Sequence, residues 1–134
     1  MPMTDSIQLV RGLYDAFAQG DVPRFLAALS PQIRWCEAES NPLADRNPYV
    51  GIDALLAGVF GRLNDDFADF RVEVGELVGG GGVVTMLGRY HATAKATGRK
   101  LDVQAAHIWW VEGGKVVRFQ QMVDTAKLLW ALGK

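Results

Sequence analysis

Two polar side chains interrupt apolar stretches of the sequence, and both are of types that can move protons. His107 stands in the run QAAHIWWV, and Glu37 directly follows Trp35 and Cys36. An unpaired buried imidazole or carboxylate is costly, so each must find a partner or line a cavity. A carboxylate in a dry cavity has a raised pKa and can act as a general base. An imidazole or an amide can then donate to the oxygen on which charge develops.

Each of these residues also has a purely structural explanation. His107 alone fits a hydrogen-bonded histidine of the core, and Glu37 alone fits a carboxylate at the rim of the fold. The aromatic residues Phe17, Trp35 and Trp109 fit ordinary core packing equally well. The residue types alone therefore leave both interpretations open.

Other kinds of site find little support in the sequence. The only cysteine is Cys36, and the two histidines, His91 and His107, have no metal-binding spacing, so we expect neither a metal nor another cofactor. The glycine run at 79–82 lacks the Lys-Ser/Thr pair of a phosphate-binding loop and joins two expected strands. It predicts a hairpin turn.

Composition narrows the class of protein. The 134 residues are 49% hydrophobic and carry 14 basic against 15 acidic side chains, for a net charge of −1. That balance argues against binding to nucleic acid, which requires clustered basic residues. The N-terminal segment MPMTDSIQLV lacks the features of a signal peptide, and no apolar run approaches the length of a membrane span. We therefore expect a cytoplasmic protein with no membrane partner.

The first third of the chain has the spacing of helices. Apolar residues three and four apart between positions 7 and 17 predict one helix, with Thr4, Asp5 or Ser6 as its cap and Gly20 at its end. Asp21 is expected to cap a second short helix, which Ser30-Pro31 stops. A third helix is expected over 52–63, after an irregular loop at 38–50 of the kind that often carries function.

The remaining elements are strands, apart from a last helix near Thr125 that Asp124 would cap. A short strand is expected at 33–37, and longer ones near 70–78 and over 83–94, 101–112 and 116–124, separated by glycine turns. The long strands form an antiparallel meander, so the fold class is α+β in a single domain, 1–134. Strand alternation puts His107 and Trp109 on one face of their strand, and Phe119 and Gln121 on one face of the next.

Several short segments, in this order and spacing, carry a family likeness. They are Ala-Gln-Gly-Asp at 18–21, Tyr49-Val50-Gly51, GRYHATAKATGRK at 88–100, and an ending of His107, Gly114-Lys115-Val116-Val117 and Asp124-Thr125. With them the chain resembles the SnoaL-like and ketosteroid isomerase-like proteins of the nuclear transport factor 2-like superfamily. The resemblance implies a cone-shaped, strongly curved antiparallel sheet with helices packed on its concave face. It also implies an internal ligand pocket and a homodimer formed through the outer sheet face.

The resemblance assigns roles to individual positions. Glu37 falls where ketosteroid isomerases carry the carboxylate that moves a proton between carbon atoms, and His107 falls where they carry an oxyanion-hole aspartic acid. Their helix tyrosine would fall at Leu13; Tyr14 is one position away, about 100° around the helix, so one phenolic donor is expected to be missing. Gln121 replaces the acid/base aspartate of SnoaL-type polyketide cyclases and would orient a substrate carbonyl.

Two functions follow as expectations. The first is a cofactor-independent acid/base enzyme (an isomerase, cyclase, lyase or hydrolase-like protein) acting on a small apolar carbonyl compound, with Glu37 and His107 catalytic. The second is a non-catalytic dimeric ligand-binding or scaffold protein. Epoxide hydration would need an Asp-Arg-Asp relay, and no aspartates suitably flank Arg89. The residues expected to contact the ligand are Tyr14, Phe17, Trp35, Tyr49, Phe60, Trp109, Phe119 and Gln121.

Overall fold

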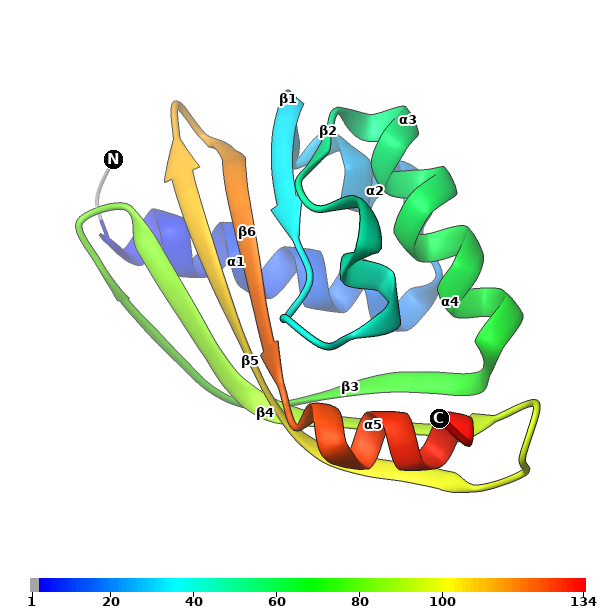
Figure 1. The fold of residues 1–134 in the computed structure, drawn as a ribbon. Helices are drawn as coiled ribbons and strands as arrows, with labels where there is room; N and C mark the ends of the chain where they lie inside the picture. Colours follow the sequence, from blue (N-terminus) through cyan, green and yellow to red (C-terminus); the bar gives the residue numbers. More distant parts are fainter. Residues whose placement is uncertain (1–2) are drawn as a thin grey trace.

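A six-stranded sheet with the strand order β2-β1-β6-β5-β4-β3 forms the frame of the molecule (Figure 1). The computed structural model describes residues 3–134, with side chains from residue 5 onward. In chain order the elements are α1 (Met3–Gln19), α2 (Val22–Ala27), β1 (Leu29–Cys36), a 3-10 helix (Pro42–Arg46), β2 (Tyr49–Val50), α3 (Ile52–Leu55), a π-helical turn (Leu56–Phe60), α4 (Gly61–Asp66), β3 (Phe67–Gly80), β4 (Val83–Ala94), β5 (Lys100–Glu112), β6 (Lys115–Val123) and α5 (Thr125–Leu132).

The long strands form the expected antiparallel meander, and helices cover one face of the curved sheet. Strands β3 to β6 pair in chain order, each antiparallel to the next. The strand β1 differs from the expectation, because it runs parallel to β6 while β2 pairs antiparallel with β1. A parallel pair requires a long crossover, and all the elements from β2 to β5 lie between these two strands in the chain. The α+β class with a strongly curved sheet is confirmed.

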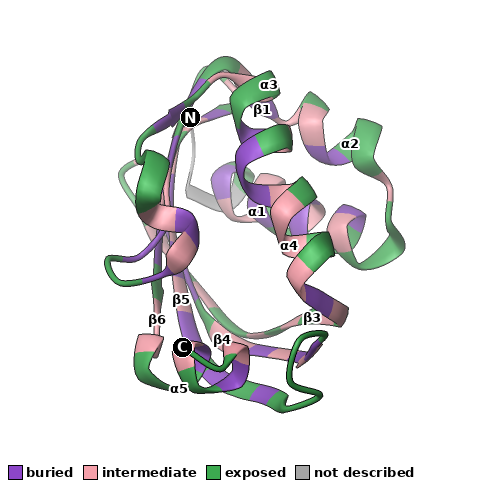
Figure 2. Cartoon of the chain, turned by 45° about the vertical axis from the view of Figure 1, so that its right-hand side comes forward, coloured by how far each residue is buried: buried purple, intermediate pink, exposed green. Residues whose placement is uncertain are grey.

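Alternation along β5 sets the inner face of the sheet. Every second residue from Leu101 to Val111 is buried, and His107 belongs to this series. Figure 2 colours the buried residues of the chain, including those of β5, purple. The strand register then aligns Met86 of β4, His107 of β5 and Gln121 of β6 in one row across the sheet. Trp109 and Phe119 are paired in the neighbouring row. The grouping of residues on a common face, predicted from strand parity, is therefore confirmed.

The first strand begins earlier than the sequence suggested. Leu29–Cys36 includes Ser30-Pro31, which was expected to separate the strand from the preceding helix. The register between β1 and β6 shifts between Leu29 and Arg34, so Pro31 falls at an irregularity where it interrupts no regular pairing. The strand ends at Cys36, so Glu37 lies one residue beyond it rather than within it.

The helix ends agree with the sequence at two of three predicted caps. The side chains of Asp21 and Asp124 accept hydrogen bonds from the backbone N–H groups of Arg24 and Lys127, as expected at helix starts. The helix α1 begins at Met3, so the predicted cap at 4–6 lies inside the helix. Within residues 3–134, no helix combines the length and apolar character needed to cross a membrane.

The third predicted helix is extended and interrupted. Helical backbone runs from Ile52 to Asp66, with a π-helical turn at Leu56–Phe60. The preceding loop contains the 3-10 helix and the two-residue strand β2, so it is more ordered than its composition suggested. Gly58 in the π-helical turn lies directly against the buried Tyr49 ring.

Two glycine-to-alanine changes should have opposite effects on stability. A Cβ at position 58 would lie 2.2 Å from Cε1 of Tyr49, so Gly58→Ala should lower the free energy of unfolding by about 1–3 kcal/mol through overpacking. A Cβ at position 12, inside α1, would have its nearest contact at 3.7 Å, so Gly12→Ala should raise it by about 0.5–1 kcal/mol. Urea unfolding measures both changes, and equal effects of the two would contradict the packing described.

Candidate functional site

An internal cavity of about 60 Å³ lies between the inner sheet face, α1 and the helical segment 52–66. Nine of the residues singled out from the sequence line it: Tyr14, Phe17, Trp35, Glu37, Phe60, His107, Trp109, Phe119 and Gln121. Six further lining residues were missed: Phe25, Val59, Leu63, Phe70, Val72 and Tyr90. The cavity wall is mainly aromatic and aliphatic, and its polar groups converge on Glu37 and His107.

Glu37 is a buried carboxylic acid at the end of β1. Only 3% of the residue is exposed, and Oε2 accepts a hydrogen bond of 3.1 Å from Nε1 of Trp35, two residues earlier in the chain. Burial raises the pKa of Glu37 to about 7, and the Trp35 hydrogen bond opposes that rise. Near neutral pH this group can therefore both accept and return a proton.

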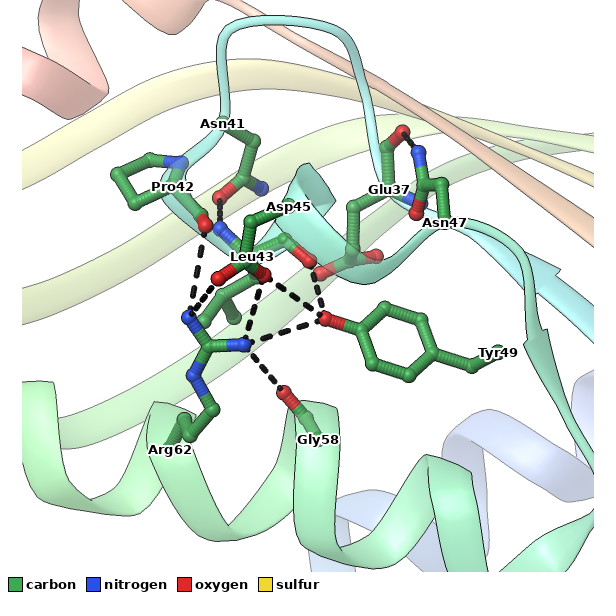
Figure 3. A network of polar contacts seen from close by, with 9 residues as sticks. All are labelled: Glu37, Asn41, Pro42, Leu43, Asp45, Asn47, Tyr49, Gly58 and Arg62. Carbon is green, nitrogen blue, oxygen red and sulfur yellow. Dashed lines mark hydrogen bonds and ion pairs between the residues drawn. The ribbon is translucent and has the colours of Figure 1, made fainter.

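The backbone of Glu37 is held on both sides by one amide. The N–H of Glu37 donates to Oδ1 of Asn47 at 3.0 Å, and Nδ2 of Asn47 donates to the carbonyl oxygen of Glu37 at 2.8 Å (Figure 3). The side-chain amide of Asn47 thus pairs with the backbone N–H and C=O of Glu37 as the backbone of a neighbouring strand would. Asn47 thereby fixes the point from which the carboxylate enters the cavity.

Tyr49, which was expected to contact the ligand, lies elsewhere. It is absent from the cavity wall, and its hydroxyl donates to the carbonyl oxygen of Leu43 at 2.5 Å. Arg62 of α4 reaches the same place, pairing with Asp45 at 2.9 Å and donating to the Tyr49 hydroxyl at 3.2 Å (Figure 3). These contacts join the 3-10 helix to α4, so Tyr49 anchors the loop that carries Asn47.

His107 is bonded at both ring nitrogens. The Tyr14 hydroxyl lies 2.6 Å from Nδ1, and the Tyr90 hydroxyl is bonded to Nε2. Burial lowers the pKa of His107 to about 3, so the imidazole is neutral at physiological pH. We call Tyr14, His107 and Tyr90 the hydroxyl–imidazole chain. The two phenols, rather than the imidazole itself, form the ends of this three-residue chain.

Each phenol of this chain also accepts a hydrogen bond from a fixed donor. Nε1 of Trp109 donates to the Tyr14 oxygen at 2.8 Å, and Nε2 of Gln121 donates to the Tyr90 oxygen at 2.9 Å. The amide of Gln121 is held in this orientation because its Oε1 accepts from the N–H of Ala38 at 3.1 Å and from Nδ2 of Asn41 at 2.9 Å. Burial raises the pKa of both phenols, so they remain protonated.

The phenolic donor that the sequence suggested was missing is present in the site. Leu13 is buried in the core, and Tyr14 beside it lines the cavity and bonds to His107. The buried side of α1 is wide enough to include both positions, because α1 packs against β3 and β4 of a curved sheet. Tyr90 was overlooked, although its strand parity with Met86 indicates the inner face.

A larger cavity of about 310 Å³ adjoins the inner one. The two share the lining residues Phe17, Phe25, Phe60, Leu63 and Phe70. The outer cavity extends to the α1–α2 turn at Gly20 and Asp21. These shared side chains separate the polar groups around His107 from the outer space. Within residues 3–134, no group of three or more His, Cys, Asp or Glu side chains is arranged to hold a metal ion.

Comparisons with known proteins agree on one family. A family model described as a SnoaL-like domain matches residues 10–119. A nuclear transport factor 2-like (NTF2-like) protein of Burkholderia thailandensis E264 is 30% identical, with 98% of each chain covered and a TM-score of 0.90. An NTF2-like protein of unknown function from Burkholderia pseudomallei K96243 is 29% identical, with 98% of this chain and all of the other covered and a TM-score of 0.89.

A more distant structure, TerC co-crystallised with polyporic acid, is 17% identical, with 97% of this chain and 99% of the other covered and a TM-score of 0.86. At that identity the similarity concerns the fold alone. A search of the curated proteins finds no match.

The two shifted pKa values predict how stability depends on pH. Between pH 4.5 and pH 7 folded Glu37 keeps a proton that the unfolded chain releases, so this group lowers the free energy of unfolding as pH rises through that range. His107 acts oppositely: below pH 6.5 the unfolded chain gains a proton that the folded state binds only near pH 3. In the wild type the two groups therefore have opposite effects on the free energy of unfolding between pH 4.5 and pH 6.5.

Glu37→Gln removes the contribution of Glu37 to this pH dependence and leaves that of His107. Its free energy of unfolding, relative to wild type, should rise by about 3 kcal/mol between pH 4.5 and pH 8, as measured by urea unfolding at a series of pH values. A difference that stays constant with pH would show that Glu37 titrates normally in the folded protein.

Proposed function

The chain belongs to the SnoaL-like family of NTF2-like proteins, and from that membership and the site geometry we propose that it binds a small apolar carbonyl compound and moves a proton on it without a cofactor. The observation that carries the proposal is the buried Glu37, whose pKa of about 7 suits a general base and acid at neutral pH. No metal or redox group enters this chemistry.

In the proposed reaction Glu37 takes a proton from the carbon next to the substrate carbonyl. The electron pair of the broken C–H bond forms the enolate, and negative charge develops on the carbonyl oxygen. A phenol of the hydroxyl–imidazole chain donates to that oxygen, and protonated Glu37 then returns the proton to carbon. His107 acts through the phenols that occupy both of its ring nitrogens, and Gln121 acts by orienting Tyr90.

The volumes of the two cavities limit how a substrate can be placed in them. A cavity of roughly 150 Å³ holds a benzene molecule, whereas the inner cavity measures about 60 Å³. The proposed ligand therefore inserts its carbonyl end beside Glu37 and keeps its apolar body in the outer cavity of about 310 Å³. Phe17, Phe60 and Phe70 line both cavities and would contact the ligand where it passes between them.

A ligand-binding or scaffold protein without turnover is the second candidate. The observation in its favour is that the polar groups of the small inner cavity bond largely to one another. Such a domain would bind apolar molecules equally well after the carboxylate is neutralised. The two candidates differ in whether Glu37 is needed for a chemical step.

Neutralising Glu37 should abolish proton transfer. In D₂O the wild type should exchange the α-protons of small cyclic enones and ketones, followed by ¹H NMR, and Glu37→Gln should lower that rate by about 10²–10⁴-fold. The matched control is Glu39→Gln, an exposed carboxylate two residues away, which should keep the wild-type rate. Equal rates in wild type and Glu37→Gln would exclude Glu37 as the base, and wild-type inactivity on the whole panel would favour the binding protein.

We also propose that two copies of the chain associate through the outer sheet face. Leu87, Ala106 and Met122 form a row across β4, β5 and β6 on the side away from His107, and Leu87 and Met122 are 47% and 51% exposed. Exposed apolar side chains in a row are typical of association surfaces.

Charges in that row should keep the copies apart. Light scattering after size exclusion should give a dimer mass for the wild type and a monomer mass for Leu87→Glu and for Met122→Glu. Val22→Glu, at an equally exposed position on α2, should remain dimeric. A monomeric wild type at high concentration would refute the association.

A further inference from the structure

The hydroxyl–imidazole chain has one more proton than its internal hydrogen bonds use. We propose that His107 is a tautomeric switch whose state decides whether Tyr14 or Tyr90 offers that extra proton to a ligand oxygen. The proposal rests on the proposed function for its ligand, and it specifies when each of the two phenols is the donor. His107 itself is a positioning residue, because it acts only through the two phenols.

Counting protons gives the first step. Tyr14, Tyr90 and neutral His107 each carry one proton on oxygen or nitrogen, three in all. Two hydrogen bonds join the three groups, one at Nδ1 and one at Nε2. Each bond uses one proton, so one remains, and it must lie on a phenol because both ring nitrogens are already engaged.

Each phenol accepts one hydrogen bond from a donor outside the hydroxyl–imidazole chain. Tyr14 accepts from Trp109 at 2.8 Å, and Tyr90 accepts from Gln121 at 2.9 Å. Neither donor can reverse, because an indole N–H only donates and the Gln121 oxygen already accepts two hydrogen bonds. The direction of the chain is therefore set by the position of the proton on His107.

Two arrangements satisfy every bond in the chain. If Nε2 is protonated, it donates to Tyr90, Tyr14 donates to Nδ1, and the Tyr90 proton is free. If Nδ1 is protonated, it donates to Tyr14, Tyr90 donates to Nε2, and the Tyr14 proton is free. In each arrangement one phenol offers a donor and the other keeps an unused acceptor site, and both residues line the inner cavity.

This pattern selects a class of ligand. A donor and an acceptor that exchange places match a molecule carrying a carbonyl and a hydroxyl oxygen that also exchange places, as in an enolised dicarbonyl compound. A ligand with only one carbonyl would use one end of the chain and fix the tautomer. The switch thus lets one rigid site follow its ligand through keto–enol exchange without moving a side chain.

Glu37 biases the switch. Glu37 and Tyr90 both line the inner cavity, and the pKa of Tyr90 is raised by burial and also by the Glu37 charge, so an anion at position 37 favours the arrangement with a free proton on Tyr90. Ionised Glu37 should therefore favour protonation of His107 at Nε2, and a neutral side chain at position 37 should shift the balance toward Nδ1. The charge of Glu37 is thereby coupled to the choice of the donating phenol.

The test measures the tautomer of His107 by ¹⁵N NMR, in which protonated and bare ring nitrogens are well separated. The chain has two histidines, so His91→Gln assigns the signals. In Tyr14→Phe, a proton on Nδ1 would have no acceptor, so the Nε2–H form should predominate; in Tyr90→Phe the Nδ1–H form should predominate. The tautomer ratio should differ between these variants by at least about tenfold. Tyr49→Phe, which removes the third tyrosine hydroxyl, should match wild type.

The same tautomer in wild type, Tyr14→Phe and Tyr90→Phe would overturn the switch and leave His107 as a fixed structural histidine. If either phenylalanine variant fails to fold, Glu37→Gln at pH 8.5 decides the matter: a shift toward Nδ1–H supports the switch, and an unchanged ratio overturns it. These measurements need no turnover. A failure of the proposed enzyme activity and a failure of the switch are therefore seen separately.

Discussion

Removal of Glu37 from water is the constraint on which the rest of the site depends. A carboxylate in an apolar interior is destabilising when charged, and its pKa of about 7 expresses that cost. The protein limits the cost with one indole hydrogen bond and leaves the group otherwise free to exchange a proton. The following loop is held in place by hydrogen bonds. Asn47 binds the backbone of Glu37, and Tyr49 with Arg62 holds the loop against α4.

The register of the sheet positions the polar side chains that line the cavity from β5 and β6. Because Met86, His107 and Gln121 are aligned across three strands, the imidazole and the amide that orients Tyr90 lie on neighbouring strands of one rigid surface. Trp109, in the next row, orients Tyr14 in the same way. The phenols are thus oriented by side chains on paired strands, whereas Glu37, the proposed base, is held by a loop. Rigid elements hold groups more accurately than loops do, which suits an arrangement in which the donors must be preorganised.

Much of this could be predicted from the sequence, for identifiable reasons. Strand alternation has a period of two, so His107 could be grouped with Trp109, and Gln121 with Phe119, on one face of each strand without a structure. That this face is the inner one was implied by the family resemblance. The expectation that one phenolic donor would be missing was wrong, because one residue of helical offset does not decide which residue faces the cavity when a curved sheet contacts a wide helix face. Tyr49 and Tyr90 could not be distinguished by residue type. Their roles depend on contacts with Leu43 and His107, which are distant in sequence or lie inside an irregular loop.

Gln121 has a consequence for charge. A carboxylate at position 121 would give the interior two ionisable acids. Because this position carries an amide, Glu37 is the only carboxyl group among the residues lining the inner cavity. His107 stays neutral and both phenols stay protonated, so the interior alternates between a net charge of zero and one negative charge. It can store one proton and no more. In the proposed reaction, any proton taken from a bound molecule must return to that molecule or leave for solvent before another can be accepted, so the site would carry a single proton.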